Sequence, residues 1–333
     1  MNPPLRRKAN FKWADSVTGK PKAELLREEG AEQGFMISFE NVSKFILSDI
    51  SFCIPDGMIA GVVGRSGSGK TTLLRLACGL LACEKGSVRT FFQDPVERRR
   101  QIAADIRFFS AGHPSFREDN TIRDEFQKLR ALYRMDKGRF LEEYEQLAGR
   151  LCFKEYEEKE IRELSLGQRR RAELAAALLG SPRLILLDEP TVGVDETGKR
   201  IFREQLLQKK ELGVTVFMAS ENRTEIEESC DRVLLLDAGR LLYYGSKDRL
   251  MRRYAPVNEM EIVFQGRLPD MDDLPLIKYS VEKNKMKFWY NENVISTLEI
   301  VNHVAAQTVI AGMQVISPGL EDVILMRREE AGL

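Results

Sequence analysis

The sequence predicts an α/β fold with a mixed β-sheet core, a helical subdomain and a small α+β appendage toward the C-terminal end. Almost wholly apolar runs, such as residues 58–63 and 184–187, are typical of strands whose sheet is covered on both faces. A helical pattern over residues 166–179, followed by Gly and Pro, leads into the second of these runs. After Pro256 the pattern changes to short alternating runs, which indicates a separate, smaller unit.

The composition excludes several classes of protein. Lys plus Arg and Asp plus Glu balance at 51 each, so nothing indicates a protein that binds nucleic acid. The apolar runs fall far short of the ~20 residues that a membrane helix needs. The first residues, MNPPLRRKANFKW, have no apolar core and do not resemble a secretory signal. Five cysteines, an odd number without metal-like spacing, favour reduced thiols in the cytosol.

We expect three segments along the chain. Residues 1–34 are polar and lack periodicity, so they form either a loosely docked extension or an arm that binds a partner. Residues 35–255 form the main domain, in which the part over about 95–175 is charged and mostly helical in pattern. Residues 256–333 form a small accessory domain.

The expected elements follow in chain order. The main domain is predicted to contain strands at residues 36–39, 50–52, 58–63, 184–187, 214–218 and 233–236 and helices at residues 71–81 and 166–179. The accessory domain is predicted to contain strands within residues 260–290 and at 313–316 and helices at 294–306 and from about 320. Charge runs within residues 95–160 are interpreted as solvated helix faces.

The run GRSGSGKTT fits the pattern G-x-x-x-x-G-K-[ST] between an expected strand and an expected helix. Glycines allow consecutive backbone N–H groups to turn inward around phosphate oxygens, and the helix start adds its positive dipole end. Lys70 supplies a charge at the β- and γ-phosphates, and the Thr71 hydroxyl is suited to ligate Mg²⁺. The candidate nucleotide ligands of this phosphate cradle are Gly64, Arg65, Ser66, Gly67, Ser68, Gly69, Lys70, Thr71 and Thr72.

Two adjacent carboxylates, Asp188 and Glu189, end the apolar run of residues 184–187. Asp188 stands at the carboxyl end of the expected strand, where it can hold Mg²⁺ through water. Glu189 can orient an attacking water or accept its proton. Alone, this acidic pair would be interpreted as a strand end, but the cradle upstream favours metal binding and catalysis.

A third motif, LSLGQ at residues 164–168, stands between the cradle and the acidic pair. The cradle, this pentapeptide and LLDEP in this order resemble the ATPases of ABC transporters over roughly residues 36–250. The resemblance implies a P-loop NTPase fold of ABC type that binds ATP and Mg²⁺. It also implies a second ATP-binding subunit, identical or not, and a separate transmembrane permease, which would place the chain on the cytoplasmic face of the cell membrane.

In this family the residues matching Ser165, Gly167 and Gln168 belong to a site that contacts the γ-phosphate of ATP held by the opposite subunit. Two chains then enclose two nucleotides. The alternative interpretation is local, because Ser165 followed by Gln168 is also a capping box for the helix that starts at Leu166. Leu166 itself departs from the family, which usually has glycine there.

Two further positions are assigned through the resemblance. Residues 191–195, TVGVD, match the loop that crosses to the partner subunit, with Asp195 as its carboxylate. Phe45 is the candidate for the aromatic ring that stacks on adenine, although the turn around it is shorter than usual. The alternative for Phe45 is a core phenylalanine.

Two family residues are missing. The Gln that senses Mg²⁺ and water and contacts the permease has no counterpart in FFSAGHP, residues 108–114. The His that touches the γ-phosphate is replaced by Glu221, unless the loop shifts by one and presents Asn222. A carboxylate repels a γ-phosphate unless it is protonated or turned away, and losing a preorganised contact costs ~10²–10³ in rate. We therefore expect intact ATP binding with slow hydrolysis.

The segment SPGLEDVIL, residues 317–325, resembles the end of ATPases in the drug, antibiotic and polysaccharide exporter branch and favours export over import. The expected function is an ATP-hydrolysing subunit that drives a separate permease. The alternative is a nucleotide-gated regulatory subunit with little turnover, which the missing Gln and His favour and Glu189 opposes. Soluble ABC proteins of translation or repair usually have two cassettes or a long coiled coil, and the sequence has neither.

Overall fold

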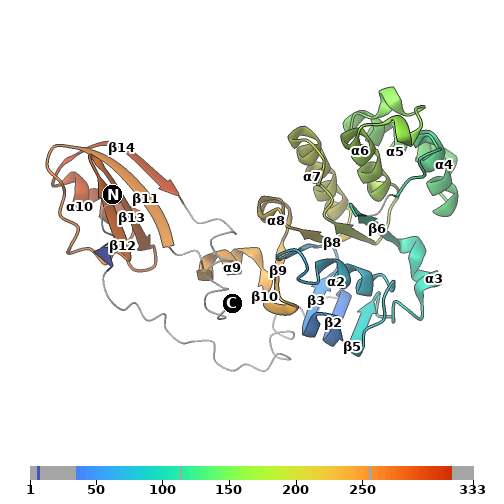
Figure 1. Cartoon of the computed structure of the whole chain (residues 1–333), viewed down its shortest axis with the longest axis horizontal. Coiled ribbons are helices and arrows are strands. Elements are labelled where there is room, and N and C mark those ends of the chain that lie inside the picture. The colour runs from blue at the N-terminus through green and yellow to red at the C-terminus, as the bar shows by residue number, and fades with distance from the viewer. Residues whose placement is uncertain (1–5, 8–34, 113–114, 255–256, 317–333) are drawn as a thin grey trace. The chain divides into compact units, whose positions relative to one another are not determined.

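The computed structural model describes residues 6–7, 35–112, 115–254 and 257–316. The chain divides into two compact units (Figure 1). The larger unit ends at Ser246, and the smaller one comprises the residues from Lys247 onward together with a short N-terminal strand. No helix in the described ranges has the length and apolar character needed to cross a membrane.

Six strands of the larger unit form one mixed sheet in the order β10-β9-β4-β8-β7-β6. All neighbours run parallel except β10, which pairs antiparallel with β9. Every residue of β4, β7 and β8 is buried, as continuous apolar runs predict. The strands are β4 Ile59–Val63, β6 Ile106–Ser110, β7 Leu184–Asp188, β8 Thr215–Ser220, β9 Arg232–Asp237 and β10 Arg240–Ser246.

A second, antiparallel sheet has the order β3-β2-β5, with β2 Phe35–Lys44, β3 Leu47–Pro55 and β5 Lys85–Thr90. Helix α2, Lys70–Ala77, packs against β5 and against β7 and β8 of the main sheet. One buried cluster therefore joins both sheets through α2, and it includes Phe39, Phe52, Leu74, Leu186 and Leu234. Each such side chain contributes about 1.5–3 kcal/mol by leaving water.

The remaining helices of the larger unit are α3 Arg99–Ile102, α4 Ile122–Leu132, α5 Lys137–Arg150, α6 Leu166–Leu178, α7 Glu196–Glu211 and α8 Arg223–Ser229. Helices α4, α5 and α6 pack on one another and lie together at one end of the unit (Figure 1). Stacked and edge-on aromatic pairs join Phe126 of α4 and Phe140 and Tyr144 of α5 with Phe153, which follows α5.

The structure differs from the expected elements in several places. Strand β6 lies within the segment interpreted as mostly helical, because Arg107 interrupts its short apolar run and no continuous apolar segment indicates a strand. Helix α2 ends at Ala77 and not near Leu81, since Gly79 follows with a φ of 71° that stops a right-handed helix. Strands β5 and β10 and helices α7, α8 and α9 were not predicted.

The smaller unit is an antiparallel sheet in the order β1-β12-β13-β11-β14 with helix α10 packed on it. Alternate residues of β11 and β13, among them Met260, Ile262 and Phe288, form its core with Ile300 of α10. The elements are β1 Arg6–Arg7, α9 Lys247–Tyr254, β11 Val257–Gln265, β12 Lys278–Glu282, β13 Lys285–Asn291, α10 Thr297–Ala305 and β14 Val309–Ile316.

Two sequence expectations concern the ends of the chain. Arg6 and Arg7, within the segment predicted to be an extension, pair with β12. The rest of that segment lies outside the described residues, as do the helix expected from about residue 320 and the SPGLEDVIL motif.

Candidate functional site

The phosphate cradle connects the carboxyl end of β4 to the first residue of α2. Gly67 and Gly69 have φ values of 76° and 109°, which residues with side chains rarely adopt. A Cβ atom on Gly64 would lie 2.1 Å from the carbonyl oxygen of Leu236, so only glycine fits. Ser68 is buried, and its hydroxyl has no hydrogen-bond partner in the described part of the chain. Such an orphan group at a glycine-rich turn is the expected partner of a bound anion.

The other cradle residues differ in exposure. Arg65 and Ser66 are exposed at the tip of the turn, whereas Thr72 is half-buried in α2. The structure therefore places all nine predicted residues in one strand–turn–helix segment, with the charged Lys70 at the helix start.

Lys70 is only 6% exposed. Its Nζ donates to the carbonyl oxygens of Gly64 at 2.8 Å and Arg65 at 3.2 Å and to Oε1 of Glu221 at 3.1 Å. Oε1 of Glu189 lies 3.7 Å from the same nitrogen. A buried ammonium needs such partners, because an unpaired charge in the interior is costly. Two carboxylates thus face the cation of the cradle.

A hydroxyl–carboxylate cluster lies beside the cradle. Thr71 Oγ1 is 3.0 Å and 2.9 Å from the two carboxylate oxygens of Asp188, which ends β7. Ser110, at the end of the neighbouring strand β6, donates its hydroxyl hydrogen to Oδ2 of Asp188 at 3.0 Å. Ser110 was not predicted, although polar residues at the carboxyl ends of adjacent parallel strands are a usual sign of a site.

The cluster fits a magnesium ion only with ligands from elsewhere. No set of three or more His, Cys, Asp and Glu side chains within the residues that the structure describes is arranged to hold a metal. Mg²⁺ commonly takes one or two protein oxygens and completes its shell with water and phosphate oxygens. Thr71 and Asp188 provide such a pair next to the cradle.

Glu189 is held in an unusual backbone conformation, with φ at 51°. Its backbone N–H donates to Ala219 O at 2.8 Å, and its Oε2 accepts from the backbone N–H of Glu221 at 3.1 Å. Oε1 is buried without a hydrogen-bond partner among the described residues. Burial raises the pKa of the Glu189 carboxyl, while the Glu221 amide and Lys70 oppose that rise. Left-handed backbone in a non-glycine residue often marks a functional position.

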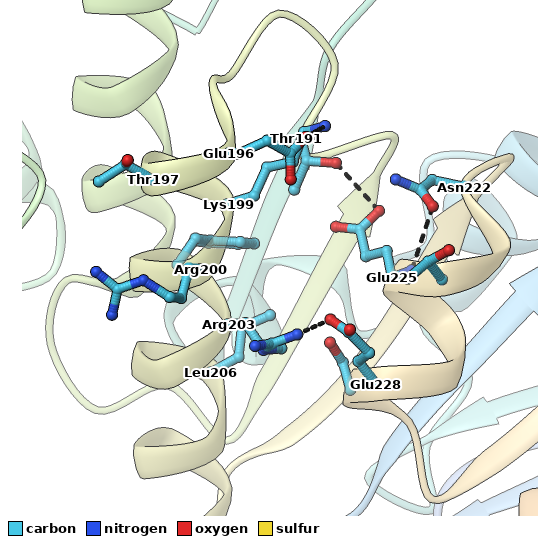
Figure 2. Close-up of a pocket in the computed structure, with 13 residues that line it drawn as sticks. Thr191, Glu196, Thr197, Lys199, Arg200, Arg203, Leu206, Asn222, Glu225 and Glu228 are labelled. Atoms are coloured by element: carbon cyan, nitrogen blue, oxygen red, sulfur yellow. Dashed lines mark hydrogen bonds and ion pairs between the residues drawn. The ribbon is translucent and has the colours of Figure 1, made fainter. Parts of the chain in front are cut away.

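A second network joins residues 191–195, the crossing loop, to the end of β8. Glu225 accepts hydrogen bonds from Thr191 Oγ1 at 3.2 Å and Ser220 Oγ at 2.7 Å. Asn222 caps α8 by accepting from the Glu225 backbone N–H at 3.3 Å. Figure 2 shows Thr191, Asn222 and Glu225 at a pocket of about 400 Å³ between α7 and α8, where Arg203 and Glu228 form an ion pair. Glu225 was not singled out from the sequence, because its partners come from separate segments.

The LSLGQ motif forms the start of α6. Ser165 accepts from the backbone N–H of Gln168 at 3.2 Å, and Gln168 accepts from the backbone N–H of Ser165 at 2.9 Å. The local interpretation, a capping box, is therefore present in the structure. Leu166 is exposed, and a Cβ atom on Gly167 would lie 3.6 Å from Gly193 O of the crossing loop. The helix start thus faces outward beside that loop.

Asp195 ends the crossing loop and caps α7. Its Oδ1 accepts from the backbone N–H of Gly198 at 3.1 Å, and its Oδ2 lies 2.6 Å from Nη2 of Arg171 in α6. The hydrogen bond from Arg171 lowers the pKa of Asp195. The carboxylate predicted to belong to a subunit contact is therefore also part of a contact within the chain.

Phe45 lies in the turn between β2 and β3 and is 69% exposed, so its interpretation as a core residue is wrong. Lys44 Nζ stands 4.7 Å from the centre of the ring. The next residues approach the cradle, since a Cβ atom on Gly69 would lie 2.5 Å from Leu47 Cδ2. The turn therefore presents an open aromatic ring next to the phosphate cradle.

The segment without the family's Gln is attached to α6. Arg170 donates to Ala111 O, just after β6, and also to Glu173 at 2.7 Å. Glu173 is buried and accepts from the backbone N–H of Ser115 at 3.2 Å. Residues 113–114 lie outside the described residues.

Comparison with known proteins places this geometry in a family. A family model described as ABC transporter matches residues 47–192. The uncharacterized ABC transporter ATP-binding protein YhcH of Bacillus subtilis (strain 168) is 31% identical over 215 residues, which are 62% of this chain and 68% of that protein. The chain belongs to the ATP-binding proteins of ABC transporters. The predicted family and fold class are therefore confirmed.

Two further similarities extend this result. The Nod factor export ATP-binding protein I of Bradyrhizobium diazoefficiens is 29% identical over 292 residues, 85% of this chain and 91% of that protein. A solved ATP-binding subunit of an ABC transporter matches with a TM-score of 0.62 and 18% identity, over 66% of this chain and 93% of that chain. The first likeness reaches beyond the ATP-binding domain, and the second shows the fold.

Proposed function

We propose that this ABC ATP-binding protein binds Mg-ATP in its phosphate cradle, pairs with a second ATP-binding subunit and drives a separate membrane permease. The observation that carries the proposal is the cluster of Lys70, Thr71 and Asp188 where β4 and β7 end. It supplies a cation, a hydroxyl and a carboxylate around a glycine-rich turn, which is the donor set that a magnesium triphosphate requires.

Within this site each residue has a distinct role. Lys70 exchanges its contacts with carbonyl and carboxylate oxygens for the β- and γ-phosphate oxygens. Thr71 and Asp188 hold Mg²⁺, which when bound neutralises charge on the phosphates. Phe45 stacks on the adenine ring beside the cradle. Ser68 donates its unpaired hydroxyl to a phosphate oxygen.

Glu189 is the proposed general base. Its carboxylate is fixed by the Glu221 amide on one side. Oε1 lies 3.7 Å from Lys70 Nζ, accepts no hydrogen bond from the described residues and is available to orient water or to take its proton. A base with a raised pKa accepts a proton more readily near neutral pH.

The second subunit is proposed to complete the site. Ser165, Gly167 and Gln168 stand at an exposed helix start, where backbone N–H groups and the dipole favour an anion. We propose that they meet the γ-phosphate held by the other subunit, with the crossing loop and Asp195 at the same interface. The partner is a second copy or a related chain.

The proposals of a permease partner and of export are supported by the family and by one relative. ABC ATP-binding subunits act on membrane partners, so we propose a peripheral position on the cytoplasmic face of the membrane. The likeness to an ATP-binding protein named for export spans most of both chains and supports export over import.

Calorimetry with Mg-ADP tests the binding site. We expect wild-type protein to bind and Lys70→Ala to lose about tenfold or more in affinity, because Lys70 contributes a direct charge. Lys199→Ala, a change at a partly exposed lysine of α7 that pairs with Glu196, is the matched control and should bind normally. Absence of nucleotide binding in the wild type would refute the proposal. Copurification with a membrane protein from detergent extract tests the partner.

A second candidate function is a nucleotide-gated subunit with little turnover. It is favoured by Glu221, whose carboxylate stands 3.1 Å from Lys70. We propose that hydrolysis by this chain is slow, since one preorganised contact typically contributes ~10²–10³ in rate. Steady-state ATPase activity of the wild type and Glu189→Gln decides between the two. Brisk wild-type activity abolished by Glu189→Gln contradicts slow turnover, and no activity in either protein supports the gated subunit.

A further inference from the structure

Glu221 is attached to the site by two different parts of the residue. Its backbone N–H donates to Oε2 of Glu189 at 3.1 Å, whereas its side chain reaches Lys70 Nζ at 3.1 Å. The side chain is 53% exposed, while that of Lys70 is 7% exposed. The cation is therefore buried and fixed, and the carboxylate approaches it from the solvent side.

The backbone around Glu221 is restrained. Ser220 is buried, ends β8 and donates its hydroxyl hydrogen to Glu225. The backbone N–H of Asn222 donates to Ser220 Oγ at 3.0 Å, and Asn222 caps α8. The segment cannot retract as a whole without breaking these bonds, so only rotation of the Glu221 side chain removes its charge from Lys70.

Negatively charged side chains outnumber the single cation at Lys70. Glu221 and Glu189 lie within 4 Å of its nitrogen, and Asp188 stands beside them through Thr71. A phosphate group that takes over Lys70 must displace Glu221 and then remain close to its charge. Like charges at a few ångström repel strongly in a partly buried site.

We infer that Glu221 is a specificity-determining residue that makes the site discriminate against the triphosphate and in favour of the diphosphate. The inference rests on the proposed function, because it requires a nucleotide in the cradle. Backbone amides of the cradle hold the β-phosphate of either nucleotide, but only the triphosphate adds a further dianionic group next to Glu221. Glu221 thus distinguishes nucleotides by their number of phosphate groups and not by their nucleobase.

The test compares two ligands on the full chain. Dissociation constants for Mg-ADP and for the Mg complex of a non-hydrolysable ATP analogue are measured by calorimetry. For Glu221→Gln we expect the affinity for the triphosphate analogue to rise about tenfold, because the substitution removes a charge repulsion that solvent partly screens. The affinity for Mg-ADP should rise by a smaller factor, because its β-phosphate also contacts Lys70 but brings less negative charge near Glu221.

Two further variants separate charge from other effects. Glu221→Asp keeps the negative charge and should keep the wild-type ratio of the two dissociation constants. Glu204→Gln removes an exposed carboxylate that pairs with Arg200 on α7 and should leave both constants unchanged.

The outcomes are distinguishable. An unchanged ratio in Glu221→Gln, with nucleotide binding intact, overturns this inference and leaves the proposed function standing. The same result follows if both affinities rise equally. Absence of any nucleotide binding in the wild type overturns both.

Discussion

The hydroxyl of Thr71 lies 2.9 Å and 3.0 Å from the two carboxylate oxygens of Asp188, although 117 positions separate the residues along the chain. One residue stands in the first turn of α2 and the other ends β7, so the contact depends on how α2 packs against the sheet. This contact links the phosphate cradle to the acidic pair.

The proposed magnesium site predicts the behaviour of Asp188→Asn. The amide keeps the size of the side chain but removes its charge, so Mg²⁺ should be held about 10- to 100-fold more weakly. Nucleotide affinity measured against Mg²⁺ concentration should rise steeply in the wild type and only slightly in the variant. Asp273→Asn, on the exposed surface of the smaller unit, should match the wild type. Equal Mg²⁺ dependence in all three proteins would contradict the assignment.

The cradle backbone predicts a steric penalty for Gly64→Ala. The added Cβ would lie 2.1 Å from Leu236 O and 2.7 Å from Ser68 Oγ, so backbone must move. We expect the free energy of unfolding to fall by about 1–3 kcal/mol, as measured by urea denaturation. Gly149→Ala is the control, because a Cβ atom there meets nothing within 4 Å in α5. Gly149→Ala should raise the free energy of unfolding by up to about 1 kcal/mol. A fully stable Gly64→Ala protein would be inconsistent with this geometry.

The buried carboxyl of Glu225 is expected to make the stability of the protein depend on pH. Burial raises the pKa of its carboxyl above the usual value, although hydrogen bonds from Ser220 and Thr191 act in the opposite direction. The folded protein therefore binds this proton more tightly than the unfolded chain does. The free energy of unfolding should fall as pH rises from the unfolded pKa through the raised folded pKa.

Glu225→Gln removes this titration and keeps an oxygen that accepts hydrogen bonds. Relative to the wild type, the variant should gain stability as pH increases from about 4.3 through the folded pKa. Urea unfolding at several pH values measures the difference. Glu196→Gln, an exposed change at the same pocket, should show no such trend. Parallel pH profiles for the wild type and Glu225→Gln would refute the prediction.

Asp195 is expected to contribute to the free energy of unfolding in two ways that substitutions can separate. Asp195→Ala loses the cap of α7 and the ion pair with Arg171, and should cost about 1–2 kcal/mol. Asp195→Asn keeps a capping oxygen and loses only the ion pair, which is partly exposed and contributes about 0.2–1 kcal/mol. Equal losses in the two variants would show that the cap has no role.

The stabilisation by the ion pair of Asp195 and Arg171 depends on pH. Because Arg171 lowers the pKa of Asp195, the stabilisation is complete above the unfolded pKa and is lost as pH falls through the folded pKa. Arg171→Ala should reduce this acid sensitivity, and the hydrogen bond from the Gly198 amide should retain the remainder. A double-mutant cycle at two pH values measures it.

Much of the fold and of the cradle could be predicted because the signals are local. Residues 64–72 are consecutive, so their glycines, lysine and threonine indicate a phosphate turn without knowledge of any distant contact. Buried parallel strands appear as apolar runs such as β7, and a helix start appears as the capping box of Ser165 and Gln168. Strand β6 was missed because Arg107 interrupts its apolar run, unlike the continuous run of β7.

The sequence by itself determined the order of motifs, the cradle and the acidic pair, since each is encoded by neighbouring residues. Only the tertiary structure decided which distant groups meet: Ser110 with Asp188, Glu221 with Lys70, and Glu225 with Thr191. The physical reason is the sheet order β4-β8-β7-β6. It brings the carboxyl ends of parallel strands together regardless of their separation along the chain.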